Sequence, residues 1–199
     1  MLFKNLKLNR GFTLVELVVV MAIATIMVTS LIIQQSKWND RLTVNAQAYE
    51  LALMIRQAQI YSLGVREDTG GSGNKFNVGY GVYIDEDLPS NQYIFFADRN
   101  GDKAYNSGEM IGGAISLTRG VTIEKFCGAT GPKPCNNDTG PLNQLVITFF
   151  RPEPKANIAL LNPGGGSGGT NPPATIYLKS VGGRVSSVKV EDNGQISVQ

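Results

Sequence analysis

Residues 98–109, DRNGDKAYNSGE, space five oxygen-bearing side chains as a calcium-binding loop of the EF-hand type does. The side chains fall on positions 1, 3, 5, 9 and 12 of such a loop, and the carbonyl of Ala104 falls on position 7. Calcium binds where several hard oxygens converge from one short, sharply turned segment. The five predicted ligands are Asp98, Asn100, Asp102, Asn106 and Glu109. The sequence therefore offers calcium as a cofactor, with the weak affinity of extracellular calcium modules.

The same loop departs from the calcium pattern in two ways. Its glycine is Gly101 at position 4, whereas Lys103 occupies position 6, where it must accept a strained turn and brings a positive charge. The flanking residues also look like strands and not like helices. The alternative interpretation is a tight hairpin loop whose Asp and Asn side chains hydrogen-bond to its own backbone. Both interpretations remain open at this point.

Histidine is absent from the sequence, and the two cysteines are Cys127 and Cys135. Ser-His-Asp catalysis, Cys-His catalysis and imidazole metal sites are therefore excluded. Two cysteines alone cannot complete a zinc site, and a redox C-x-x-C motif is missing. The intervening GATGPKP favours a turn, so a structural disulfide is expected, with two free thiols as the alternative. We expect no enzymatic reaction from this chain.

The charge distribution gives little support to nucleic-acid binding. The formal net charge is +2, and Lys4, Lys7 and Arg10 supply three of the 18 basic residues. The chain after Gly11 therefore carries 15 basic residues against 16 acidic ones. A nucleic-acid partner is not indicated, because no basic excess remains in the rest of the chain.

Glu16 is a carboxylate inside an apolar run that covers residues 12–33. As a helix this run would span about 33 Å, enough to cross the hydrocarbon core of a bilayer. Three positive residues precede it, so residues 1–11 are expected in the cytoplasm and the rest of the chain outside. A cleaved secretory signal would have a shorter apolar core and a small-residue cleavage site. A plain signal anchor fits the length but leaves the cost of Glu16 in the membrane unexplained.

A third interpretation supplies that carboxylate with a partner. The stretch RGFTLVELVVVMAIATIMV resembles the class III signal of type IV pilins and type II secretion pseudopilins. The resemblance implies that a membrane peptidase cuts between Gly11 and Phe12 and then methylates the new amine of Phe12. It also implies that Glu16 of an incoming subunit pairs with the Phe12 amine of a neighbour already in a filament. Burying such a carboxylate alone is unfavourable in free energy, and assembly supplies the positively charged amine that offsets this cost.

No proline occurs before Pro89, so one helix is expected from Phe12 to about Ser62. Its outer half, residues 34–63, carries two apolar stripes on nearly opposite sides. One stripe consists of Leu42, Ala46, Tyr49, Leu53 and Ile60, and the other of Val44, Ala48, Leu51, Ile55 and Ala58. Polar residues, including Gln47 and Gln59, are expected on the surface between them. We expect one stripe to pack on the protein's own sheet and the Val44 stripe to contact neighbouring subunits. The alternative is a helix buried on both sides.

After Gly64, the predicted helix stop, short alternating segments rich in β-branched and aromatic residues indicate strands. Asn193-Gly194 predicts a two-residue hairpin turn. The predicted fold class is α+β, with the long N-terminal helix packed on an antiparallel β-sheet, as in pilins. The expected divisions are a cleaved leader (1–11), a membrane helix (12–33), its amphipathic half (34–63) and a β-rich domain (64–199).

The C-terminal RVSSVKVEDNGQISV and the segment YIFFADRNGDKAYNSGEMI resemble the H class of minor pseudopilins. The family resemblance implies a structural subunit, a minor one, of a type IV pilus or type II secretion pseudopilus. Its implied partners are other pilins or pseudopilins, prepilin peptidase and the assembly platform in the bacterial inner membrane. Alternatives are a tip-located minor pilin that binds DNA or another ligand, and a signal-anchored extracytoplasmic domain unrelated to filaments.

Overall fold

The computed structural model describes residues 11–64, 67–68, 70, 76–128, 135–137, 142–162, 167–170 and 173–199. The predicted leader residues Lys4, Lys7 and Arg10 lie outside the described residues. The chain divides into two compact units, Met1–Asn39 and Asp40–Gln199. A single helix, α1 (Leu14–Leu63), contributes to both.

Helix α1 begins and ends at residues that favour helix termini. Thr13 precedes it, and the Thr13 hydroxyl accepts a hydrogen bond from the Glu16 N–H at 3.2 Å. This contact caps the first turn, because it satisfies one of the N–H groups that have no partner within the helix. At the other end the Gly64 N–H donates to the Ile60 carbonyl at 2.9 Å, so the predicted stop at Gly64 is confirmed.

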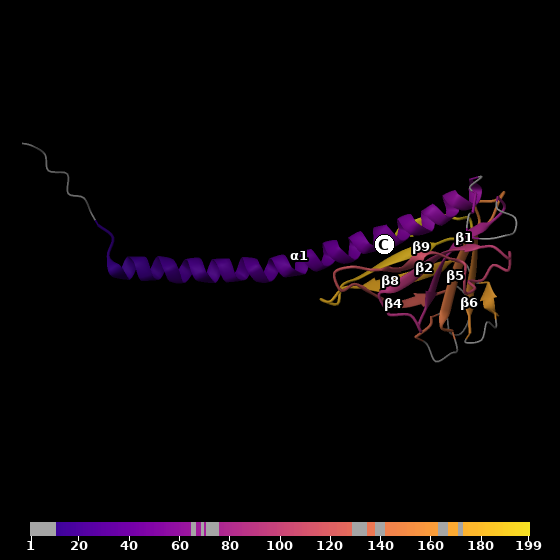
Figure 1. Ribbon diagram of the computed structural model, residues 1–199. Helices are drawn as coiled ribbons and strands as arrows, with labels where there is room; N and C mark the ends of the chain where they lie inside the picture. The colour runs from indigo at the N-terminus through magenta and orange to yellow at the C-terminus, as the bar shows by residue number, and fades with distance from the viewer. Residues whose placement is uncertain are drawn as a thin grey trace, which may run out of the picture. The chain divides into compact units, whose positions relative to one another are not determined.

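The second unit contains two antiparallel sheets beside the C-terminal part of α1 (Figure 1). The six-stranded sheet has the order β3-β2-β1-β5-β6-β7. Its strands are β1 (Gly79–Asp85), β2 (Gln92–Asp98), β3 (Met110–Ser116), β5 (Gln144–Phe149), β6 (Ala156–Leu161) and β7 (Ser167–Thr170). The four-stranded sheet has the order β10-β9-β8-β4. Its strands are β4 (Thr122–Cys127), β8 (Ala174–Lys179), β9 (Val185–Val190) and β10 (Ile196–Val198).

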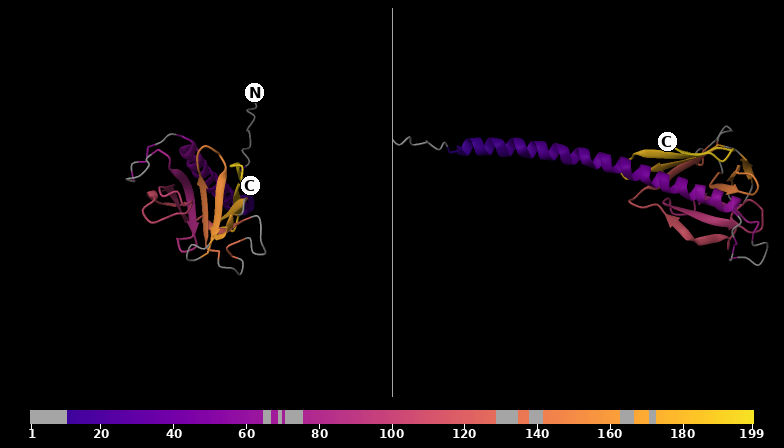
Figure 2. Two further views of the ribbon diagram at one scale, coloured as in Figure 1. Left: turned by 90° about the vertical axis from the view of Figure 1, so that its right-hand side faces the viewer. Right: turned by 90° about the horizontal axis from the view of Figure 1, so that it is seen from above.

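The α+β class is therefore confirmed, with two sheets where the sequence suggested one. Seen from above, the yellow C-terminal strands lie on one side of this part of α1 and the magenta strands on the other (Figure 2). In the six-stranded sheet Val82 of β1 pairs with Phe95 of β2 and with Ile147 of β5. All three side chains belong to the main hydrophobic core, which also includes residues of α1 and of the four-stranded sheet.

The six-stranded sheet is also covered on its other face. A second, smaller cluster there contains Tyr83, Ile94, Phe96 and Val146. Tyr105 packs over it, with its ring centroid 4.7 Å from that of Tyr83 and 5.5 Å from that of Phe96. The central strands are therefore apolar on both faces.

The hairpin between β9 and β10 turns through three residues and not two. Glu191 pairs with Gln195 through its N–H at 2.9 Å, which leaves Asp192, Asn193 and Gly194 in the turn. Gly194 has a φ of 83°, a left-handed conformation that favours glycine. The Asn-Gly signal thus located the hairpin correctly, but the turn is one residue longer than predicted.

Candidate functional site

The predicted processing residues lie immediately before α1. Gly11 and Phe12 have no regular structure, and the Phe12 side chain is 80% exposed. Thr13 and Glu16 form the Thr-x-x-Glu pattern of a helix capping box, with Glu16 as the third residue of the helix. A carboxylate in the first turn of a helix is also favoured by the helix dipole. Glu16 therefore has a local role that the pattern could have revealed, beside the intermolecular role predicted for it.

The apolar part of α1 satisfies its hydroxyl groups within the helix. Thr25 donates to the Ala22 carbonyl at 2.8 Å, and Thr29 donates to the Thr25 carbonyl at 2.7 Å. Polar groups in a hydrocarbon environment need such internal partners. In the described part of the chain α1 is the one helix long and apolar enough to cross a membrane, and its most apolar stretch is not covered by the protein itself.

The two apolar stripes of the outer half of α1 lie in different environments, and the prediction of which one faces outward was wrong. Val44, Ala48, Leu51, Ile55 and Ala58 are all buried in the main core. Leu42, Ala46, Tyr49, Leu53 and Ile60 are exposed, and we call them the outer stripe. The alternative of a helix buried on both sides is also contradicted. Ala48 and Ala58 give the physical reason, because small side chains let strands approach the helix closely.

Gln47 and Gln59, predicted on the surface, are instead buried and hydrogen-bonded to loops of the second unit. The Thr118 N–H donates to the Gln47 side-chain oxygen at 2.7 Å. The Gln59 amide donates to the carbonyls of Pro154 at 2.9 Å and Gly194 at 3.1 Å. A buried amide requires such partners, and these lie too far away in sequence to be read from a local pattern.

The acidic loop after β2 uses most of its predicted ligands for its own hydrogen bonds. The Asp98 carboxylate accepts from the N–H groups of Gly101 at 2.7 Å and Lys103 at 2.8 Å. Lys103 has a φ of 64°, so the strained backbone predicted at this position is confirmed. Burial raises the pKa of Asp98, although the two N–H donors act in the opposite direction.

The remaining predicted ligands form two groups. Asp102 accepts from the side-chain amides of Asn100 at 2.9 Å and Asn106 at 2.6 Å. Burial opposes the ionisation of Asp102, but hydrogen bonds from Ala104, Asn106 and Asn100 outweigh it and lower its pKa. Glu109 is buried and accepts from the N–H groups of Arg99 at 3.0 Å and Asn106 at 2.9 Å. This pattern corresponds to the hairpin-loop interpretation, and among the described residues no cluster of three or more His, Cys, Asp or Glu is arranged to hold a metal.

Calcium binding by this loop stays a prediction, and calorimetry tests it. Titration of calcium into the full chain is expected to give a dissociation constant of about 0.1–1 mM, because the loop must release N–H groups to free its oxygens. Asp102→Asn removes one charged ligand and should abolish the heat. If the parent chain gave no heat of binding at millimolar calcium, the prediction of a calcium site would be wrong.

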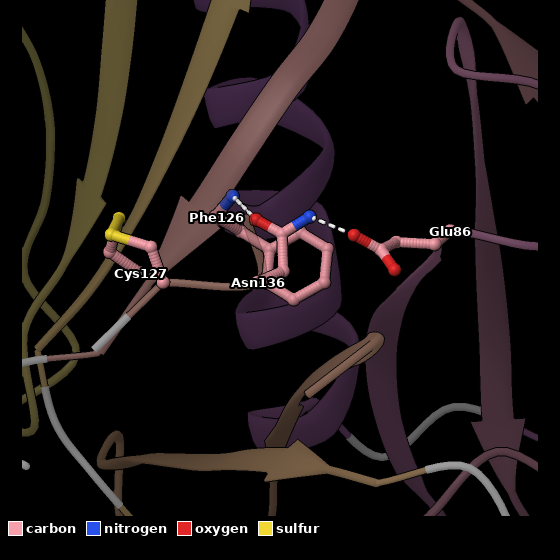
Figure 3. Close-up of a disulfide and its surroundings, with 5 residues drawn as sticks. Glu86, Phe126, Cys127 and Asn136 are labelled. Atoms are coloured by element: carbon pink, nitrogen blue, oxygen red, sulfur yellow. Dashed lines mark hydrogen bonds between the residues drawn. A yellow bond between two sulfur atoms is a disulfide. The ribbon is translucent and has the colours of Figure 1, made fainter. Parts of the chain in front are cut away.

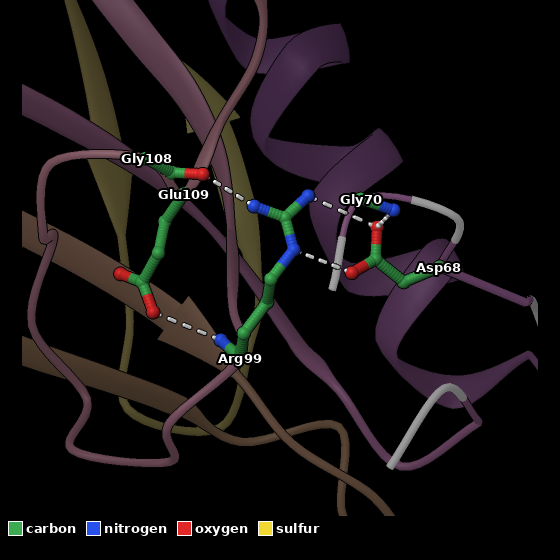
Figure 4. A network of polar contacts seen from close by, with 5 residues as sticks. All are labelled: Asp68, Gly70, Arg99, Gly108 and Glu109. Atoms are coloured by element: carbon green, nitrogen blue, oxygen red, sulfur yellow. Dashed lines mark hydrogen bonds and ion pairs between the residues drawn. The ribbon is translucent and has the colours of Figure 1, made fainter. Parts of the chain in front are cut away.

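Arg99 is a key residue of this loop that the sequence did not reveal. Its guanidinium makes two bonds to Asp68, from Nε at 2.6 Å and from Nη2 at 3.1 Å (Figure 4). Nη1 donates to the Gly108 carbonyl at 2.6 Å. The guanidinium also lies directly against Gly70, where a Cβ atom would overlap it. Arg99 thus holds the segment after α1 to the loop between β2 and β3.

Breaking this ion pair is expected to destabilise the second unit strongly. Asp68 and Arg99 are 8% and 19% exposed, so Arg99→Ala removes both guanidinium bonds from a largely buried carboxylate. We expect a loss of about 3–5 kcal/mol in the free energy of unfolding, measured by urea denaturation. Arg99→Lys should recover little of it, because lysine cannot make the two parallel bonds.

The exposed Lys155–Glu153 pair, 3.6 Å apart, is the matched control. Lys155→Ala should change the free energy of unfolding by less than about 0.5 kcal/mol. Equal effects of Lys155→Ala and Arg99→Ala would contradict a structural role of the buried pair.

Cys127 and Cys135 form a disulfide, as predicted. In the chain-entropy model a ring of this size stabilises the fold by about 2.5 kcal/mol. The adjacent Asn136 accepts a bond from the Phe126 N–H at 2.8 Å and donates to the Glu86 carboxylate at 2.7 Å (Figure 3). Phe126 belongs to β4, whereas Glu86 follows β1 directly. Asn136 therefore links the two sheets.

The comparisons with known proteins concern the N-terminal segment. Residues 6–32 match the family model described as the prokaryotic N-terminal methylation motif. Searches of curated proteins and of solved structures gave no match. The matched residues include Gly11, Phe12 and Glu16, and the motif is a prepilin-type signal. It indicates a type IV pilin-like substrate of prepilin peptidase, and with the apolar helix it fits a membrane-anchored, single-pass protein.

Proposed function

We propose that this chain is a structural subunit, of minor rank, in a type IV pilus or a type II secretion pseudopilus. The observation that carries the proposal is the methylation motif at residues 6–32, which includes the beginning of an apolar helix that the protein's own chain leaves uncovered. A helix of this kind needs either lipid or other helices around it. On assembly this helix would move from lipid into contact with other helices. The chain itself would catalyse no reaction.

Processing would take place between Gly11 and Phe12. Both residues precede the first turn of α1, so a peptidase can reach this bond without unwinding the helix. Cleavage would leave a charged amine on Phe12, which the same enzyme would methylate. Residues 1–11 would then lie in the cytoplasm and the second unit outside it, in accordance with the three positive residues of the leader.

Mass spectrometry of the mature protein tests this step. We expect a mature N-terminus at Phe12 that is heavier by one methyl group, in cells that contain prepilin peptidase. Cells without the peptidase should retain residues 1–11. An uncut chain in both backgrounds would point instead to a signal-anchored domain unrelated to filaments.

Two features of α1 would act in assembly. Glu16 would pair with the methylated Phe12 amine of a neighbouring subunit, since a carboxylate at low dielectric is strongly favoured by an opposite charge. The outer stripe would contact neighbouring helices further along, because it remains exposed on the second unit. The partners would be other pilins or pseudopilins, prepilin peptidase and the assembly platform.

The resemblance of the β9–β10 hairpin and of the acidic loop to the H class supports a minor pseudopilin as the more specific proposal. The hairpin is tied to α1 by the Gln59 bond to Gly194, and the loop is tied to the segment after α1 by the Arg99 bonds to Asp68. Both features would then be rigid parts of the subunit. Co-purification with components of one secretion or pilus machine would test this assignment.

A further inference from the structure

We propose that Asn136, held in place by the Cys127–Cys135 disulfide, covers the free edge of β4 and so prevents a second copy of this chain from pairing with that edge. The inference goes beyond the proposed function, because it concerns a sheet edge and not α1. All of the residues involved belong to the second unit.

Four strands form the edges of the two sheets, β3 and β7 in the six-stranded sheet and β10 and β4 in the four-stranded one. An edge strand presents backbone N–H and C=O groups that can pair with another chain. Three of these edges are poor templates for pairing. β3 is interrupted by Gly112 and Gly113, which have φ values of 76° and 109°, and β7 and β10 are only four and three residues long.

The sequence of β4 favours pairing with another strand. Residues 121–127, VTIEKFC, are rich in β-branched and aromatic side chains and contain one acid, one base and no Gly or Pro. Segments of this composition pair readily with other chains when they lie at an open edge. Both charged side chains contact the neighbouring strand β8. Glu124 pairs with Lys179 at 2.8 Å, and the Lys125 Nζ lies 5.0 Å from the centroid of the Tyr177 ring.

Asn136 covers this edge by binding both backbone groups of Phe126. The Phe126 N–H donates to the Asn136 Oδ1 at 2.8 Å, and the Phe126 carbonyl accepts from the Asn136 N–H at 3.0 Å. A residue of a paired antiparallel strand would make the same two bonds. Nearer the start of β4, the Ile123 N–H donates to the Ser90 carbonyl at 2.6 Å. These backbone groups are therefore already bonded within the chain.

Two contacts fix the position of Asn136. Cys127 is the last residue of β4 and forms both a disulfide and an antiparallel bridge with Cys135, so the residue after Cys135 lies beside Phe126. The Asn136 Nδ2 donates to the Glu86 carboxylate at 2.7 Å, on the other side from β4 (Figure 3). An amide whose nitrogen is bonded on one side presents its oxygen on the other. The disulfide and Glu86 together thus direct Oδ1 toward the edge.

A second copy of this chain is the partner that an uncovered β4 edge would take. Two copies of one edge can pair antiparallel about a twofold axis, which gives a self-complementary contact. The edge carries one acid and one base, Glu124 and Lys125, and opposite charges on paired strands attract each other. Such pairing would join two copies through a surface other than the outer stripe.

Carbodiimide cross-linking of the full chain in detergent micelles tests the proposal. Isotope-labelled and unlabelled chains are mixed, and a link between Glu124 of one copy and Lys125 of another is recognised in the mass spectrum by its mixed isotope content. The open variant combines Cys127→Ser, Cys135→Ser and Asn136→Ala. We expect this variant to give the mixed link and the parent chain to give none, because only the variant has a free edge.

The matched control keeps the two serines and replaces Asn136→Ala by Asn137→Ala, at the exposed next residue. Its yield of the mixed link should be about tenfold lower than that of the open variant, because Asn136 can still bond to Phe126. Equal circular dichroism spectra show that both variants are folded.

Hydrogen exchange of the Phe126 amide, measured by NMR, gives a second arm with the disulfide intact. Asn136→Ala should make this exchange about tenfold faster, because it removes the acceptor of the Phe126 N–H. Asn137→Ala should leave the rate unchanged. This arm contains no serine substitution, so it remains informative if the serine variants unfold.

Three results would overturn the inference. They are equal yields of the mixed link from the open variant and the parent, equal yields from the open variant and its matched control, and a Phe126 exchange rate that does not respond to Asn136→Ala. Neither measurement requires a filament, so a failure of the proposed filament role would leave both results valid.

Discussion

Replacing Glu16 by alanine is expected to abolish incorporation into filaments while leaving membrane insertion intact. An opposite charge at about 4 Å and an effective dielectric constant of 20 is worth about 4 kcal/mol, which corresponds to roughly a thousandfold loss in the assembled fraction. The unpaired acid also costs a few kcal/mol in the membrane, so its removal favours the unassembled chain. Sedimentation of sheared filaments, with membrane fractionation in parallel, measures both quantities.

Because Glu16 also takes part in the capping box with Thr13, the control variants must separate its charge from its role in the cap. Glu16→Gln keeps a side chain suited to the third position of a capping box but removes the charge. If the charge acts between subunits, Glu16→Gln should fail as completely as Glu16→Ala. Thr13→Ala removes the cap hydroxyl, costs about 1 kcal/mol in helix stability and keeps the charge, so it should still assemble. If Glu16→Gln assembled normally, the charge of Glu16 would have no role between subunits, and its part in the capping box would be its only role.

The second large effect separates two leucines that are two positions apart on α1. Leu51 is fully buried, so Leu51→Ala should cost about 2–5 kcal/mol and lower the melting temperature by about 10 °C. Leu53 is 67% exposed on the outer stripe, so Leu53→Ala should change the free energy of unfolding by less than about 0.5 kcal/mol. Thermal denaturation followed by circular dichroism measures the difference.

The same pair tests the assembly contact. Leu53→Asp should reduce incorporation into filaments without changing the melting temperature, because it places a charge on the surface proposed to meet other helices. Filament yield and melting temperature are measured on the same preparations. If Leu53→Asp assembled as well as the parent, the outer stripe would have no part in subunit contacts.

The parts of this protein that sequence could predict depend on local patterns. Charge, length and apolar character fix the N-terminal segment without any tertiary information. Gly64 marks the end of α1, and Gly194 marks a turn through its left-handed backbone. The stripes of α1 show the limit of this approach. Helical periodicity reveals two apolar sides, but it does not tell which one the sheets cover.

The remaining differences involve partners that are distant in sequence. Gln47 and Gln59 look like surface residues until Thr118, Pro154 and Gly194 supply their hydrogen bonds. Arg99 resembles any other charged loop residue until Asp68 lies beside it. The burial and the partners of such polar groups depend on the tertiary structure, and a single sequence does not show which residues will pair.

The ring closed by Cys127 and Cys135 has a consequence for when the protein matures. Thiols remain reduced in the cytosol, so the disulfide beside Asn136 forms only where oxidants are present. A subunit retained on the reducing side would lack this covalent link next to the Asn136 contact. The disulfide would thus form only after the polypeptide has been translocated.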